Sequence, residues 1–126
     1  MIRTAVDDLL AQARRSLTRL DPAAALEAMR SGATLIDIRA ESQIAEGGLI
    51  PGALVIARNT LEWRLDPDCA YRHPAAPGLD DQVILVCNDG YQSSLAAATL
   101  QQLGFARATD LDGGFQAWRQ EGLPVR

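Results

Sequence analysis

The sequence is most informative in residues 83–104, VILVCNDGYQSSLAAATLQQLG. Four consecutive apolar residues, 83–86, are typical of a strand that is buried on both faces of a sheet. A short polar loop follows, and then a helix pattern that begins with serines and ends at Gly104. Cys87 is the first residue of this loop, so it lies between the end of a predicted strand and the start of a predicted helix.

The rest of the chain alternates between helix and strand patterns. The Asp21-Pro22 pair is a typical helix start, with the Asp as N-cap and the Pro at the first helical position. The other expected elements are a helix over 4–15, strands over 33–38, 54–56 and 107–111, a helical turn over 59–65, and a last helix opened by Gly113-Gly114. This alternation predicts an α/β domain with a largely parallel sheet that helices cover on both sides.

The position of Cys87 favours chemistry at its thiol. In open parallel sheets, ligands bind beyond the carboxyl ends of the strands, and Cys87 is expected there. The positive end of the helix dipole and the unpaired backbone N–H groups favour a thiolate. A loop that curls back can cradle an anionic sulfur, and Gly90 can supply the positive φ that such a curl needs. We expect Ser93 or Ser94 to cap the helix and to donate a hydroxyl toward the sulfur.

The local pattern also fits a different interpretation, because a free Cys at the end of a core strand is often buried and inert.

The amino-acid composition excludes several classes of function. The 126 residues, 48% hydrophobic and 22% charged, are typical of one ordinary globular domain. All twelve basic residues are Arg, which excludes a P-loop lysine and a Schiff-base lysine. One His and two Cys are too few for a typical zinc site, and a net charge of −4 argues against nucleic acid as a partner.

The amino-terminal residues argue against targeting to a membrane or to secretion. Arg3, Asp7 and Asp8 interrupt the apolar run that a signal peptide would need. No stretch approaches the roughly 18 uninterrupted apolar residues of a membrane span. We therefore expect a cytoplasmic protein without a membrane partner, in which both thiols stay reduced.

Four motifs, taken in order, resemble a rhodanese-like domain of the single-domain sulfurtransferase type. They are LIDIR at residues 35–39, GLIPGA at 48–53, the six-residue loop CNDGYQ at 87–92 with the serine-rich helix behind it, and Gly113-Gly114 followed by Ala117-Trp118. The resemblance covers about residues 20–124 of a single domain spanning residues 1–126, and residues 1–19 form a helical extension outside it. It implies a three-layer α/β sandwich around a five-stranded, mostly parallel sheet.

The resemblance also implies a function. A sulfurtransferase of this type moves sulfane sulfur from a donor such as thiosulfate to an acceptor such as cyanide or a thiol, through a persulfide on Cys87. The donor is a small molecule or a protein, and no cofactor or metal is implied. The implied binding residues in the loop are Asn88, Asp89, Gly90, Tyr91, Gln92 and Ser93.

The loop departs from many catalytic members of the family in its charge. Those members carry Arg or Lys in or just after the loop, whereas this loop has the acidic Asp89, which should repel a dianionic donor. Cationic help is expected from Arg39 or Arg58, which follow the carboxyl ends of predicted strands. Either arginine could instead form a structural ion pair. For Arg39 the candidate partners are Glu41 and Asp37. The charge pattern therefore supports an alternative hypothesis, a weakly active or non-catalytic sulfur-carrier or regulatory module.

A phosphatase or an arsenate reductase of related fold is the third hypothesis, but it requires a loop one residue longer that ends in an Arg.

Outside the loop, Cys69 is interpreted as a bystander and His73 as a surface or loop-anchoring residue. Trp63 and Trp118 are interpreted as packing residues, and Tyr91 is expected to line the mouth of the site.

Overall fold

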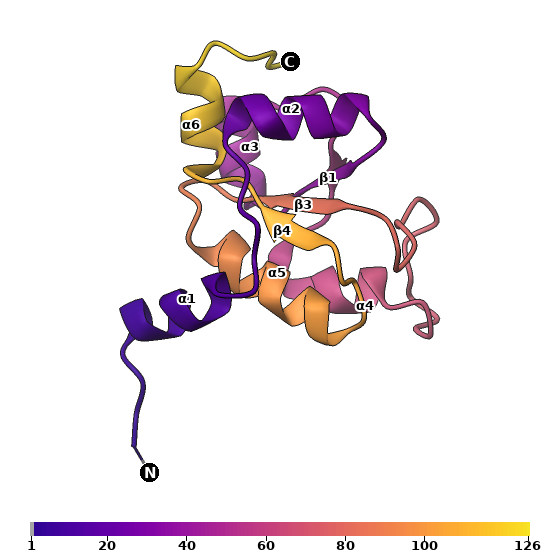
Figure 1. The fold of residues 1–126 in the computed structure, drawn as a ribbon. Coiled ribbons are helices and arrows are strands. Elements are labelled where there is room, and N and C mark those ends of the chain that lie inside the picture. Colours follow the sequence, from indigo (N-terminus) through magenta and orange to yellow (C-terminus); the bar gives the residue numbers. More distant parts are fainter. Residues whose placement is uncertain (1) are drawn as a thin grey trace.

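A four-stranded parallel sheet forms the centre of the computed structural model, which describes residues 2–126 (Figure 1). The strands lie in the order β2-β1-β3-β4. Their bounds are Thr34–Asp37 for β1, Leu54–Val55 for β2, Val83–Val86 for β3 and Ala108–Asp110 for β4. Every neighbouring pair is parallel, so all four carboxyl ends meet at one edge of the sheet.

Strand β3 lies inside the sheet and is completely buried, as its continuous apolar sequence predicts. Because side chains alternate along a strand, its residues contribute to both faces. Val83 and Leu85 belong to one hydrophobic cluster, and Ile84 and Val86 belong to the other. The strand thus carries the core of both layers and places Cys87 at the edge where its carboxyl end emerges.

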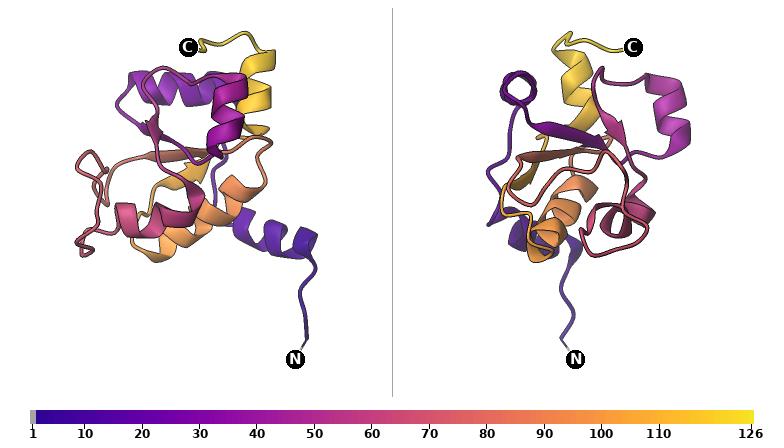
Figure 2. Two further views of the ribbon diagram at one scale, coloured as in Figure 1. Left: turned by 180° about the vertical axis from the view of Figure 1, so that it is seen from behind. Right: turned by 90° about the vertical axis from the view of Figure 1, so that its right-hand side faces the viewer.

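Helices cover both faces of the sheet, as Figure 1 shows from the front and Figure 2 from behind and from the side. The helices are α1 Val6–Arg14, α2 Pro22–Arg30, α3 Glu41–Gly47, α4 Leu61–Leu65 after a 3-10 turn Arg58–Thr60, α5 Gln92–Gln102 and α6 Gly114–Gln120. Helices α4 and α5 pack on the face of Val83 and Leu85, while α2 and α6 pack on the other face. Helix α1 lies against α5. Within residues 2–126, no helix is both long enough and apolar enough to cross a membrane.

The α/β fold with a parallel sheet is confirmed, but the expected fifth strand is wrong. In its place Leu20 forms a single parallel bridge with Leu111. The next residue, Asp21, already caps helix α2 by accepting a hydrogen bond from the Ala24 N–H at 2.8 Å. Pro22 has no N–H to extend the ladder. The helix start predicted at this pair is confirmed, and it is the reason why the pairing ends after one residue.

Candidate active site

Cys87 lies directly after β3, and five residues, 87–91, connect this strand to α5. Its side chain is buried, with 6% of the residue exposed. The sulfur is surrounded by backbone. Sγ accepts hydrogen bonds from the N–H groups of Gly90, at 3.2 Å, and Ser93, at 3.4 Å. Gly90 has a φ of 87°, which confirms the expected positive φ at this position, and its N–H is the one donor within the loop that bonds the sulfur in the described structure.

Two carbonyl groups of the same loop bond the start of α6. The Cys87 carbonyl accepts from the N–H of Phe115 at 2.8 Å, and the Asn88 carbonyl accepts from the N–H of Gln116 at 3.1 Å. Gly114 permits this close approach, because a Cβ there would lie 2.6 Å from the Cys87 oxygen and 2.7 Å from the Asn88 oxygen. The Gly113-Gly114 pair therefore allows the start of α6 to pack directly against the cysteine loop.

The two serines of α5 do not have the capping role that we expected. Tyr91 is the N-cap, and no side chain caps the helix. Instead, the hydroxyls of Ser93 and Ser94 donate to one carboxylate oxygen of Asp110, at 2.7 and 2.8 Å. Because its proton is directed to Asp110, the Ser93 hydroxyl accepts from the Cys87 thiol at 3.2 Å rather than donating to it. The expected direction of that hydrogen bond is therefore also wrong for the thiol form.

Asp110, Arg19 and Arg14 complete the surroundings of the loop and were not predicted. Asp110 is fully buried at the end of β4, and Arg19 pairs with it at 2.9 Å. Burial lowers the pKa of Arg19, but the hydrogen bond and charge of Asp110 outweigh this effect. With smaller contributions from Asp112 and Cys87, the pKa of Arg19 is raised above its ordinary value. The only sequence signal was a carboxylate within a predicted strand, which needs a partner when it is buried.

A cavity of about 200 Å³ opens beside the sulfur. Its lining residues are Arg39, Gln43, Cys87, Asn88, Asp89, Tyr91 and Gln92. The structure thus brings most of the predicted binding residues together, while Gly90 and Ser93 hold the sulfur from the other side. Tyr91 is 64% exposed, in keeping with a place at the mouth. Arg58 lines an adjacent cavity that also contains Arg39 and Gln92.

Neither of the two expected cations is free of an acidic partner. Arg39 is buried and donates to Asp37 through Nη2 at 2.7 Å and through Nε at 3.0 Å, which confirms the ion pair with Asp37. Its guanidinium also lies over the Phe115 ring, 3.8 Å from the centroid. Arg58 pairs with Glu62 at 2.8 Å. A contact of either guanidinium with substrate stays a prediction.

The remaining candidates lie away from this arrangement. Cys69 is a free thiol in the connection between α4 and β3 and does not line the cavity beside Cys87. His73 accepts a hydrogen bond from the Ala75 N–H at 2.9 Å, which confirms that it anchors its loop. Trp118 is buried in the core, whereas Trp63 is 57% exposed.

Comparison with known proteins identifies the family. Residues 21–121 match the family model of the rhodanese-like domain. The chain belongs to the rhodanese family. The rhodanese-like match begins after Leu20, so Arg14 and Arg19 lie outside it.

Relatives of this rhodanese-like chain include proteins named as sulfurtransferases. A sulfurtransferase of Allochromatium vinosum is 34% identical over 91 residues, which cover 72% of this chain and 76% of that protein. The thiosulfate sulfurtransferase GlpE of Stutzerimonas stutzeri is 36% identical over 101 residues, or 80% of this chain and 84% of its own. A solved structure from Rhodopseudomonas palustris, of unknown function and described as a possible tyrosine phosphatase, has a TM-score of 0.90 and 32% identity. That similarity covers 100% of this chain and 97% of the other.

Proposed function

We propose that this rhodanese-like domain is a sulfurtransferase that transfers sulfane sulfur through a persulfide on Cys87. The donor is a compound such as thiosulfate, and the acceptor is a thiophile such as cyanide or a thiol. The observation that carries the proposal is the pair of backbone N–H groups, from Gly90 and Ser93, that converge on the Cys87 sulfur. The relatives named as sulfurtransferases support the same reaction class.

The reaction has two displacement steps. In the first, the Cys87 thiolate attacks the outer sulfur of thiosulfate, so that a new sulfur–sulfur bond forms while the bond within the donor breaks. Sulfite leaves with the electron pair of the broken bond. In the second step, cyanide attacks the outer sulfur of the persulfide, thiocyanate leaves, and the thiolate is restored. No histidine is needed, because the backbone donors that face Sγ stabilise the Cys87 thiolate.

The direct test is to incubate the protein with thiosulfate and to measure its intact mass. We expect a gain of about 32 Da, the mass of one persulfide sulfur, and peptide mapping should place it on Cys87. A protein whose Cys87 thiol is alkylated readily but gains no sulfur from thiosulfate would contradict the proposal.

The charge at the mouth supports the alternative of a sulfur carrier or regulatory module with poor thiosulfate activity. Asp89 is exposed and lines the cavity, while the nearby cations Arg39 and Arg58 are paired with carboxylates. Because thiosulfate is a dianion, a negative charge at this mouth opposes its approach. A persulfide donor of lower charge would be opposed less.

We therefore expect Asp89→Lys to raise kcat/KM for thiosulfate about fivefold, and Gln92→Arg to act in the same direction. Thiocyanate formation measured over a range of ionic strength checks this result, since the gain should shrink as salt increases. Asp80→Lys is the control, because it makes the same charge change at an exposed residue of the connection before β3, outside the cavity. Equal turnover of the wild type and Asp89→Lys would rule out the electrostatic explanation.

The phosphatase hypothesis has support only from the description of the Rhodopseudomonas palustris protein. A phosphatase loop needs a cation that closes on the oxyanion, and residues 88–92 contain none. We expect no hydrolysis of p-nitrophenyl phosphate above background by a preparation that forms the persulfide. Hydrolysis that is lost in Cys87→Ser would revive this hypothesis.

A further inference from the structure

Two arginines that precede residues 21–121, the part of the chain that matches the family model, donate hydrogen bonds to the cysteine loop. Arg14 is the last residue of α1, and Arg19 lies in the connection to α2. The Gly90 carbonyl accepts from Nη2 of Arg14 at 2.8 Å and from Nη2 of Arg19 at 2.9 Å. Arg14 also donates through Nε to the Ser94 hydroxyl at 3.0 Å. Both guanidiniums therefore meet at one backbone atom of the loop.

That carbonyl oxygen belongs to a residue that also contacts the sulfur through its N–H. The N–H of Gly90 is one of the two donors that face Cys87 Sγ. Gly90 has no Cβ and a positive φ of 87°, so its backbone is the part of the loop with the greatest conformational freedom. Two charge-assisted hydrogen bonds on its carbonyl hold that group outward. The carbonyl shares a planar trans peptide with the Tyr91 N–H, which therefore points the opposite way. While the arginines hold this peptide, it cannot turn its oxygen toward the sulfur.

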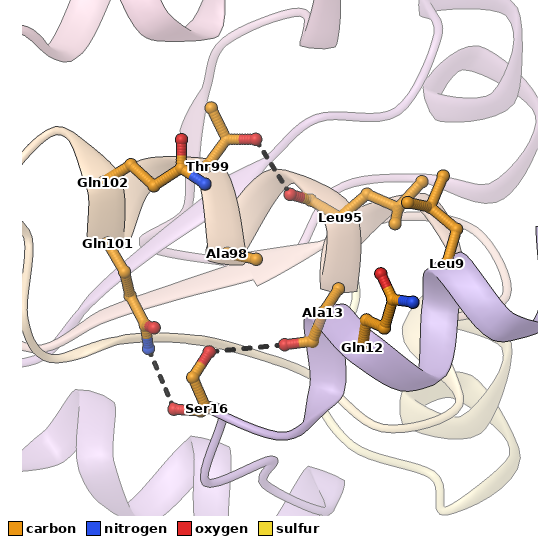
Figure 3. Close-up of a pocket in the computed structure, with 9 residues that line it drawn as sticks. All are labelled: Leu9, Gln12, Ala13, Ser16, Leu95, Ala98, Thr99, Gln101 and Gln102. Atoms are coloured by element: carbon orange, nitrogen blue, oxygen red, sulfur yellow. Dashed lines mark hydrogen bonds between the residues drawn. The ribbon is translucent and has the colours of Figure 1, made fainter. Parts of the chain in front are cut away.

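The segment that carries the two arginines is itself attached to the domain. The side-chain amide of Gln101 donates to the Ser16 carbonyl at 3.0 Å, across the groove between α1 and α5 (Figure 3). The Thr109 hydroxyl donates to the Thr18 carbonyl at 2.8 Å. The bridge between Leu20 and Leu111 follows. Two of these attachments lie between Arg14 and Arg19 and the third directly follows Arg19, so the backbone that carries the guanidiniums is held in place.

The charges around the sulfur explain why two cations are needed. Asp110 is fully buried and connects to Sγ through the Ser93 hydroxyl, so its negative charge alone would oppose a sulfur anion. Arg19 neutralises this carboxylate by donating to both of its oxygens, at 2.9 and 3.2 Å, and also pairs with the exposed Asp112. At the mouth, Asp89 is negative and Arg39 is already paired. Among residues 2–126, Arg14 forms no salt bridge with a carboxylate, so its positive charge acts on the loop without a paired counter-charge.

We propose that Arg14 and Arg19 are positioning residues, which hold the Gly90–Tyr91 peptide so that its oxygen stays away from the sulfur, and which supply the positive charge that the loop lacks. This inference rests on the proposed role of Cys87 as the sulfur-accepting nucleophile. It gives residues 1–19, outside the family match, a part in the reaction of the domain.

The test compares Arg14→Gln with Arg15→Gln. Both remove one positive charge at neighbouring positions, but the Arg15 side chain is exposed and makes no hydrogen bond to the loop. For Arg14→Gln we expect the rate of persulfide formation from thiosulfate to fall about tenfold, since one charge-assisted hydrogen bond that acts through the loop is lost. We expect Arg15→Gln to stay within about twofold of the wild type.

A second measurement does not require sulfur transfer. The rate of Cys87 alkylation by iodoacetamide is measured against pH in a Cys69→Ser background, where Cys87 is the one remaining thiol. In Arg14→Gln its midpoint should move to higher pH, because the thiolate loses stabilisation. Arg14→Lys, which keeps the charge but cannot bridge Gly90 and Ser94 with a planar fork, should restore part of this shift.

The outcomes separate the inference from the proposed function. If the wild type gains no sulfur from thiosulfate but Arg14→Gln shifts the alkylation profile, the proposed function fails and the positioning role stands. If the wild type gains sulfur while Arg14→Gln and Arg15→Gln match in rate and profile, the positioning role fails alone. Amide hydrogen exchange of Gly90 should be faster in Arg14→Gln than in Arg15→Gln at equal global stability, and equal exchange would count against a fixed loop.

Discussion

Cys87→Ser is expected to lower cyanide-dependent thiocyanate formation from thiosulfate at least about 10³-fold, to the background rate. A serine oxygen cannot form a persulfide and is not ionised near neutral pH. The substitution is nearly isosteric, and the new hydroxyl can keep the hydrogen bonds from Gly90 and Ser93. The fold should therefore survive while the chemistry is lost. Thiocyanate assays and intact mass after thiosulfate treatment measure the effect.

The matched control is Cys69→Ser, since Cys69 is the other cysteine of the chain and lies outside the cavity beside Cys87. We expect this variant to retain the wild-type rate and to gain one sulfur. An equal loss of activity in both variants would show that Cys69 acts as a resolving thiol, against the bystander interpretation.

Gly114→Ala is expected to reduce the free energy of unfolding by about 3 kcal/mol. Gly114 has a φ of 63°, which costs an alanine energy by itself. A Cβ would also lie within 2.7 Å of three backbone atoms, the oxygens of Cys87 and Asn88 and the nitrogen of Gly90. None of these is a flexible side-chain end, so the loop must shift. Urea unfolding gives the stability, and iodoacetamide alkylation reports on the displaced sulfur cradle.

Gly32→Ala separates the two causes of this loss. Gly32 also has a positive φ, of 107°, but a Cβ there would meet nothing within 4 Å. This variant should lose only about 1 kcal/mol, with an unchanged rate of Cys87 alkylation. If Gly114→Ala is no more destabilised than Gly32→Ala, the close packing of the Gly-Gly pair against the loop is not an important constraint.

The sequence predicts the parts of this site that local patterns determine. Residues 83–86 form a strand with the predicted bounds, because a continuous apolar run between polar segments has few other solutions. The curl at Gly90 is also predicted locally, because glycine adopts a positive φ without steric cost. Helix α3 was not predicted, because its sequence ESQIAEG has little apolar periodicity and the helix has no buried residue. The fifth strand was expected from the resemblance alone, and the helix start at Asp21-Pro22 prevents it.

The arrangement around Asp110 could not be predicted, because its contacts join residues far apart in the chain. Arg19 and Asp110 are separated by 91 positions, and Arg14 and Gly90 by 76. No periodicity or turn chemistry relates such pairs. The serines were wrongly assigned to capping for the same reason, since the buried carboxylate of Asp110 in β4 accepts hydrogen bonds from their hydroxyls.

The hydrogen-bonded carbonyls of the loop limit how much the backbone must rearrange during sulfur transfer. Those of Cys87, Asn88, Gly90 and Tyr91 all accept hydrogen bonds from donors of the domain itself. The loop is thus preorganised, and little conformational entropy remains to be lost when a charged sulfur arrives. A domain of this kind should accept sulfur with almost no structural change. The expected readout is near-identity of the amide NMR spectra of the thiol and persulfide forms, except for residues next to the sulfur.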